Sequence, residues 1–175
     1  MKVGYRVNSG LFKKYAEEFF FAITKISYIL LAVMAFFGVF FIFIGVFFNY
    51  KLFNSQSEYV ITVVCSVLDL LIVIALVCVN LVNRKRFITN SMKAFNTKFG
   101  ETTVAYTCEF FDNYFMITND VNDDKKVIYD SEVKRVVVSK NIVSLVANDR
   151  VWFLNKQSLN DDGVEFIKQR YCKKQ

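Results

Sequence analysis

Two long apolar segments decide the fold of this chain: ISYILLAVMAFFGVFFIFIGVFF at residues 26–48 and YVITVVCSVLDLLIVIALVCVNLV at residues 59–82. The first contains no charged residue, and the second contains one, Asp69. A helix of either length reaches ~35 Å, which is enough to cross the hydrocarbon core of a bilayer, ~30 Å. Because only ten residues separate the segments, the sequence predicts a transmembrane helical hairpin.

Basic residues gather beside the two apolar segments. The chain has 22 Lys and Arg residues against 16 Asp and Glu residues, and its net charge is +6. Lys and Arg resist translocation, so their placement predicts a two-pass protein of the cell membrane with both termini cytoplasmic. Anionic lipid attracts cations beside a membrane span. We expect this contact from three residues that directly follow the second segment: Arg84, Lys85 and Arg86.

Two alternatives to this interpretation are disfavoured. A signal peptide is not expected, because the first apolar segment begins only after 25 residues, is too long, and ends in FFNY without a small-residue cleavage site. Nucleic-acid binding would also suit a basic protein, but the membrane surface is the simpler explanation of charges placed beside the spans. The lipid bilayer is therefore the predicted partner, and nucleic acid is not.

The segments outside the two spans have clear periods. Val3–Val7 alternates apolar and polar residues, as a strand does, Asn8 and Ser9 can cap a helix start, and Leu11–Phe20 has the spacing of an amphipathic interfacial helix. Phe87–Phe99 has helical spacing among basic residues, and Gly100 is suited to end that helix. The predicted parts are residues 1–25 (strand and interfacial helix), 26–82 (hairpin), 83–100 (basic juxtamembrane helix) and 101–175 (cytoplasmic β-domain).

The remainder of the chain has the alternation of strands and ends in a helical pattern. With the N-terminal strand, which we expect to belong to the same domain, this gives seven strands and one closing helix, an α+β arrangement. The predicted strands are Thr102–Phe110, Tyr114–Thr118, Lys125–Tyr129, Glu132–Val138, Ile142–Ala147 and Arg150–Asn155, and the predicted helix is Asp161–Tyr171.

This order of two spans, a basic helix, meandering strands and a final helix resembles the bacterial YcxB-like family. The stretch that carries the resemblance is FFDNYFMITND…KKVIYDSEVKRVVVSKNIVSLVANDRVWFLNKQSLNDDGVEFIKQRY. The family has a W-x-x-I/V-x-x-V step, an I-P-K element and a helix with a central Phe. Here those places are taken by Tyr129, Val133 and Val136, by Phe153–Lys156, and by Phe166, with Tyr129 in place of the Trp and Asn155 in place of the Pro. The resemblance implies a PH-like β-sandwich or roll under the membrane, and no enzymatic activity.

Several chemistries lack their residues in this sequence. There is no His, so triads, general bases and metal sites that use His are excluded. No GxG or Walker A loop and no CxxC pair occurs, and the acidic turn NDVNDDKK lacks the spacing of a calcium loop. We therefore expect a protein that is not an enzyme, with no catalytic residue, cofactor or metal ion.

Asp69 is the candidate functional residue inside the membrane, where an Asp costs ~3 kcal/mol at the centre of a span. Sixteen Leu, Ile and Val residues in the same span offset this penalty. Gly38 is predicted at the depth of Asp69, and Gly38 and Gly45 share a helix face where the two helices approach closely. One helical face carries a polar stripe: Thr62, Cys65, Ser66, Asp69 and Asn80.

A polar stripe is expected to face protein, and two roles for it stay open. In the first, Asp69 is protonated or hydrogen-bonded to Ser66 and backbone carbonyls, and joins helices within the hairpin or in a homo-oligomer. In the second, Asp69 is a proton or ion site in an oligomeric pathway. The first is preferred, because two spans in one chain cannot enclose a pathway without oligomerising.

The predicted function is a membrane-anchored adaptor or regulatory protein that presents its cytoplasmic domain to an unknown protein partner. The candidate surfaces are the strand edges, the terminal helix and Trp152, although a Trp in an alternating strand can equally lie in the core. The identity of the partner does not follow from the sequence.

Overall fold

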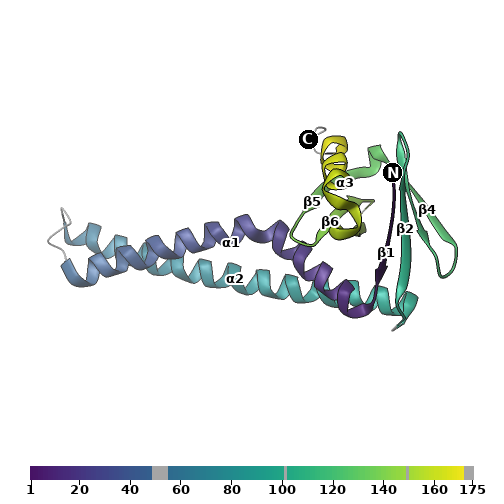
Figure 1. The fold of residues 1–175 in the computed structure, drawn as a ribbon. Helices are drawn as coiled ribbons and strands as arrows, with labels where there is room; N and C mark the ends of the chain where they lie inside the picture. Colours follow the sequence, from purple (N-terminus) through teal and green to yellow (C-terminus); the bar gives the residue numbers. More distant parts are fainter. Residues whose placement is uncertain (49–54, 101, 149, 172–175) are drawn as a thin grey trace. The chain divides into compact units, whose positions relative to one another are not determined.

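The computed structural model describes residues 1–48, 55–100, 102–148 and 150–171. They form two compact units, one of residues Thr24–Lys85 and one of Met1–Ile23 together with Arg86–Gln175. Figure 1 shows the elements of both, two long helices, two small sheets and a C-terminal helix. This is the coarse layout that the sequence predicts. The junction between the units falls inside helices α1 (Ser9–Phe48) and α2 (Gln56–Phe99), which contribute to both.

The helices α1 and α2 are both long and apolar enough to cross a membrane. Within Thr24–Lys85 their less exposed side chains recur at alternating intervals of four and three residues. This period of 3.5 is the one with which two helices pack in a left-handed coil. The positions are 24, 28, 31, 35, 38, 42 and 45 on α1, and 59, 63, 66, 70, 73, 77 and 80 on α2.

In the other unit, the start of α1 and the end of α2 are both capped, as the sequence predicts. Asn8 caps α1, because its side-chain oxygen accepts the Leu11 N–H at 2.8 Å. At the far end of α2, Gly100 has a φ of +62° and donates its N–H to the Asn96 carbonyl at 2.8 Å. Glycine takes this left-handed conformation without steric cost, so the helix ends after Phe99.

The seven predicted strands are all present and form two antiparallel sheets. The first sheet has the order β1-β2-β3-β4 and the second the order β5-β6-β7. The predicted membership of the N-terminal strand is confirmed, because β1 pairs with β2 from Lys2↔Glu109 to Val7↔Val104. The bounds are β1 Lys2–Val7, β2 Val104–Phe110, β3 Tyr114–Asn119, β4 Asp124–Tyr129, β5 Val133–Val138, β6 Ile142–Ala147 and β7 Arg150–Asn155, with a 3-10 turn η2 at Asp130–Glu132 and helix α3 at Lys156–Tyr171.

Predicted boundaries differ from the structure at β1, β2, β3, β4, β5 and α3, and local reasons account for three of these differences. The strand predicted from Thr102 begins at Val104, because the Thr102 hydroxyl bonds to the Phe99 carbonyl and extends the end of α2. Glu132 lies in the 3-10 turn and not in a strand. Helix α3 begins at Lys156 and kinks at Asn160 (φ 57°). Its early start is capped by Asn155, whose side-chain oxygen accepts the Gln157 N–H at 2.8 Å.

The first turns of α1 cover one face of the three-stranded sheet. The Phe153 ring on β7 lies 5.5 Å from the ring of Phe12, 6.2 Å from that of Tyr15 and 5.9 Å from that of Phe19, centroid to centroid. Edge-on contacts of this kind stabilise by about 0.5–1.5 kcal/mol each beyond the burial of their area. They make the amphipathic helix a layer of the β-domain core.

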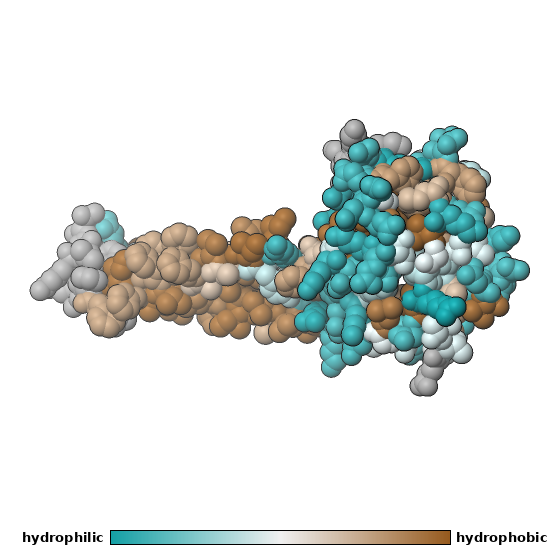
Figure 2. Space-filling model, in the orientation of Figure 1, coloured by the Kyte–Doolittle hydropathy of each residue, from teal (hydrophilic) through white to brown (hydrophobic). Residues whose placement is uncertain are grey.

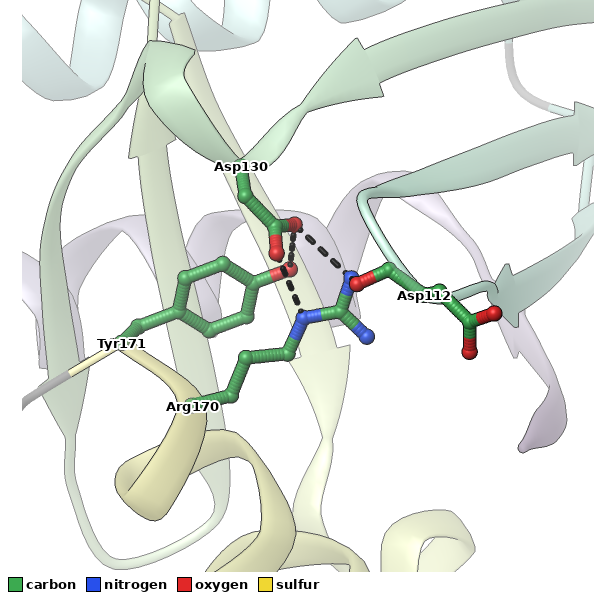
Figure 3. A network of polar contacts seen from close by, with 4 residues as sticks. All are labelled: Asp112, Asp130, Arg170 and Tyr171. Atoms are coloured by element: carbon green, nitrogen blue, oxygen red, sulfur yellow. Dashed lines mark hydrogen bonds and ion pairs between the residues drawn. The ribbon is translucent and has the colours of Figure 1, made fainter.

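A polar network fixes the last turn of α3 to the turns of the first sheet (Figure 3). Arg170 donates through Nε to Asp130 Oδ2 at 2.8 Å and through Nη2 to Asp130 Oδ1 at 3.0 Å. The same Nη2 reaches the Asp112 carbonyl at 2.9 Å, and the Tyr171 hydroxyl donates to Asp130 Oδ1 at 2.8 Å. The Arg170 and Asp130 side chains are both only 13% exposed. Such a shielded, bidentate pair is costly to break from one side.

We expect Arg170→Ala to lower the free energy of unfolding by about 2–4 kcal/mol, because it removes three charge-assisted hydrogen bonds and leaves the Asp130 carboxylate without its cation. Lys168→Ala on the same helix is the control. Its ion pair with Glu165 is exposed and long, 3.6 Å, so its loss costs about 0.5 kcal/mol or less. Thermal unfolding of the detergent-solubilised chain measures both, and equal losses would contradict the assignment.

Candidate functional site

The predicted intramembrane stripe lies on the packed face of α2. Ser66 is buried, at 6% exposure, and Thr62, Asp69 and Asn80 are partly buried, whereas most other residues of this apolar segment are exposed. Cys65, in contrast, is exposed. It lies beside the covered face of α2, which includes positions 62 and 69 as well as 59, 63, 66, 70, 73, 77 and 80.

Gly38 lies against Asp69, so the two residues are at the same depth along the helix pair, as predicted. A Cβ atom on Gly38 would be 3.2 Å from Asp69 Oδ2 and 3.0 Å from Leu70 Cγ. At Gly45 a Cβ atom would be only 2.8 Å from Val63 Cγ2. Both glycines are therefore places where the backbone of α1 approaches side chains of α2 closely, as small residues allow in membrane helices.

The expected hydrogen bond between Asp69 and Ser66 is not present. The Ser66 hydroxyl donates to the Thr62 carbonyl at 2.8 Å, and the Thr62 hydroxyl donates to the Glu58 carbonyl at 2.8 Å. Each hydroxyl has a single proton, so neither can donate to the carboxyl group as well. This back-bonding within the helix is a common way to satisfy Ser and Thr in apolar surroundings.

The two glycines give a graded prediction for the hairpin. Gly45→Ala is expected to destabilise it by about 1–3 kcal/mol, because Val63 is β-branched and cannot rotate away. Gly38→Ala is expected to cost less, since Leu70 can change its rotamer. Helix content during titration from mild detergent into SDS measures both. Ala32→Gly, at an exposed position of α1, controls for the intrinsic helix preference, and a larger loss for Gly38→Ala would contradict the argument.

The three residues predicted to contact anionic lipid, Arg84, Lys85 and Arg86, all have exposed side chains on α2. Exposure leaves them accessible to lipid headgroups, although it does not test that contact. Among the residues that the structure describes, no group of three or more Cys, Asp or Glu side chains is placed to hold a metal ion. Asp124, in the acidic turn, is instead paired with Lys98 at 2.6 Å.

Glu18 attaches α1 to the turn between β5 and β6, a role that sequence reasoning did not find. Its Oε1 accepts the Ser139 hydroxyl at 2.8 Å and the Asn141 N–H at 2.7 Å, and its Oε2 accepts the Asn141 side-chain amide at 3.0 Å. Burial raises the pKa of Glu18, but the hydrogen bonds from Asn141, Ser139 and Lys140 outweigh burial and hold that pKa below its ordinary value.

We expect this carboxylate to make stability depend on pH. A lowered pKa in the folded state means that Glu18 stabilises the fold above its ordinary pKa of 4.5 and loses this effect as pH falls through the folded-state pKa. Glu18→Gln should therefore cost about 1–2 kcal/mol near neutral pH and progressively less below pH ~4.5. Unfolding at several pH values measures the difference. Glu17→Gln is the matched control, and a Glu18→Gln effect independent of pH would contradict the prediction.

Trp152, the predicted partner-surface residue, is half-buried and lines a groove. The groove has a volume of about 570 Å³ and lies entirely within residues 1–23 and 86–175. Its walls come from β1, β2, β7 and the parts of α1 and α2 that belong to the same unit. The helical spacing of the aromatics in Phe87–Phe99 indicates a packed face, but it cannot reveal that strands from both ends of the chain meet there.

An exposed apolar surface lies on the outer face of the four-stranded sheet. Phe111 stacks on Tyr114 with ring centroids 4.7 Å apart, and Tyr114 pairs across the sheet with Tyr129. Phe111, Val127 and Tyr129 are 39%, 44% and 56% exposed. We call Phe111, Tyr114, Met116, Val127 and Tyr129 the aromatic face. Aromatic residues exposed together in this way are typical of protein-binding surfaces.

Comparison of the chain with family models, with curated proteins and with solved structures found no match. The resemblance to the YcxB-like family therefore stays a prediction. What the chain can do has to be argued from its own residues.

Proposed function

We propose that this chain is a bacterial integral membrane protein that holds a PH-like domain at the cytoplasmic surface of the cell membrane. The observation that carries the proposal is the apolar surface of residues 24–85, where large side chains such as Ile29, Phe36 and Leu71 are more than half exposed. Figure 2 shows this surface as a brown region along the hairpin. Water cannot solvate so continuous an apolar surface, whereas lipid can.

The PH-like assignment rests on the order of the elements. A four-stranded and a three-stranded antiparallel sheet follow one another along the chain and are succeeded by one helix, α3. The acidic turn between β3 and β4 does not suit a phosphoinositide headgroup, because Asp120 and Asp123 would repel its phosphates. The nearby cation, Lys98, is already paired with Asp124. These residues support protein binding better than headgroup binding as the role of such a domain.

The aromatic face is the surface that we assign to this partner, in place of Trp152. Tyr and Phe supply most of the binding energy in many interfaces, because they bury a large area at a small cost in entropy. The chain has no His to activate a nucleophile, and the proposed role is that of a non-enzymatic adaptor or regulatory protein. A homo-oligomer, joined through the hairpin, is compatible with it.

Two experiments in intact cells test this function together. Reporter fusions after Gln175 and within residues 49–58 should place the C-terminus inside and the loop outside the cell. A photo-crosslinking amino acid at Tyr129 should capture a discrete protein, whereas the same amino acid at Glu165, exposed on α3, should not. An external C-terminus would contradict the topology. Crosslinking that is absent at Tyr129, or equal at the two sites, would contradict the adaptor role.

Asp69 distinguishes this function from an oligomeric proton or ion pathway. In liposomes, Asp69→Asn should leave assembly and proton flux as in the unchanged chain, while Asp69→Leu should weaken assembly modestly, because membrane hydrogen bonds average ~0.6 kcal/mol. A pH-dependent flux that is present in the unchanged chain and lost in Asp69→Asn would favour the pathway, since an amide cannot titrate.

A further inference from the structure

The groove beside Trp152 has the chemistry of a ligand site. Its volume of about 570 Å³ falls within the range of about 300–1,000 Å³ that is usual for small-molecule pockets. Aromatic rings form most of the lining, among them Phe12 and Phe95, whose centroids are 4.5 Å apart, and Trp152 on β7. An interior this apolar favours a ligand with a long or broad hydrocarbon part.

Hydroxyl groups without a protein partner open into this groove. Tyr5 is only 9% exposed and lines it, and among the described residues no donor or acceptor pairs with its hydroxyl. Tyr106, whose ring is stacked on that of Tyr5 with the centroids 5.7 Å apart, is half-buried and also lines the groove. Burial raises the pKa of Tyr106 to about 12 and raises the pKa of Tyr5 well above its ordinary value, so both hydroxyls keep their protons and can donate. A ligand acceptor in the groove would therefore gain a hydrogen bond from either hydroxyl.

Each polar group at the groove can donate a hydrogen bond, and one of them is a cation. Arg150, on the rim, is exposed and has no ion-pair partner in the described part of the chain. Asn90 and Ser91 of α2 add an amide and a hydroxyl. A guanidinium group beside neutral donors is complementary to a carboxylate or a phosphate, which only accept.

We propose that this groove binds a single acyl chain with an anionic headgroup, the hydrocarbon against the aromatic walls and the headgroup at Arg150. This ligand class has two sources, a free fatty acid and a monoacyl phospholipid. The inference that the membrane supplies this ligand rests on the proposed membrane location, since Phe87 on the groove wall follows the predicted second span by five residues. The site would make the domain responsive to the lipid composition of its membrane.

The single Trp of the chain provides the test, because bromine on a bound acyl chain quenches a Trp that it contacts. The full-length protein in phosphatidylcholine nanodiscs is titrated with palmitate brominated at mid-chain and, separately, with lysophosphatidylglycerol brominated at the same carbon. We expect saturable quenching by at least one of them, and the tighter one identifies the source. The uncharged methyl ester of the brominated palmitate should bind at least tenfold more weakly.

Variants separate groove binding from general contact with lipid. Arg150→Gln should raise the half-saturating concentration about tenfold, as the loss of a charge-assisted hydrogen bond does, while Arg135→Gln, at an exposed position of β5, should not. Ala94→Phe, which places a ring in the groove, should abolish saturable quenching. Asn96→Phe on the same helix, outside the lining, should retain it. Unchanged melting temperatures show that the variants are folded.

Three outcomes would overturn the site: no saturable quenching by either probe, equal quenching in Ala94→Phe, or equal binding of the methyl ester. If brominated phosphatidylcholine quenches Trp152 equally in the unchanged chain and in Ala94→Phe, that result shows contact of Trp152 with the bilayer and also overturns the site. If the membrane proposal is wrong, the result is different, because alkaline carbonate then extracts the protein from cell membranes. Binding at the aromatic face is read separately, from crosslinking at Tyr129.

Discussion

The contact of α1 with the three-stranded sheet is the interaction on which the rest of the β-domain depends. Phe12, Tyr15 and Phe19 surround Phe153 and bury one face of that sheet. The same helix face brings Glu18 to the turn between β5 and β6 and places Phe12 against Phe95 on the groove wall. The residues before the first apolar segment are thus a structural layer of the domain.

The sequence predicted those elements whose signals are local. The helical spacing of Leu11–Phe20, the cap at Asn8 and the end at Gly100 need only neighbouring residues to be recognised, and the structure has all three. All six strands after residue 100 were also predicted, two of them, β6 and β7, with the bounds of the structure. Strand alternation and turn residues suffice for that, because each strand has one face in the core.

The features that the sequence did not reveal depend on residues far apart in the chain. Arg170 and Asp130 are 40 residues apart, and Glu18 and Asn141 are 123 apart. The groove joins β1 to β7, so neither its volume nor its donors can be inferred from any one segment. In the hairpin, a helical face drawn from the sequence groups Cys65 with Thr62 and Asp69, but Cys65 is exposed. Only the partner helix decides which side of the polar stripe is covered.

Two hydroxyls of the domain have no hydrogen-bond partner among the described residues, but their surroundings differ. Ser144 is fully buried on the central strand β6, between its cross-strand neighbours Val137 and Phe153, and its Oγ has no hydrogen-bond partner among the described residues. Such a hydroxyl costs about 1–3 kcal/mol of stability. The Tyr5 side chain, in contrast, lines a groove large enough to admit a ligand. A hydroxyl without a protein partner is therefore a loss of stability at Ser144, whereas at Tyr5 it is available to a ligand in the groove.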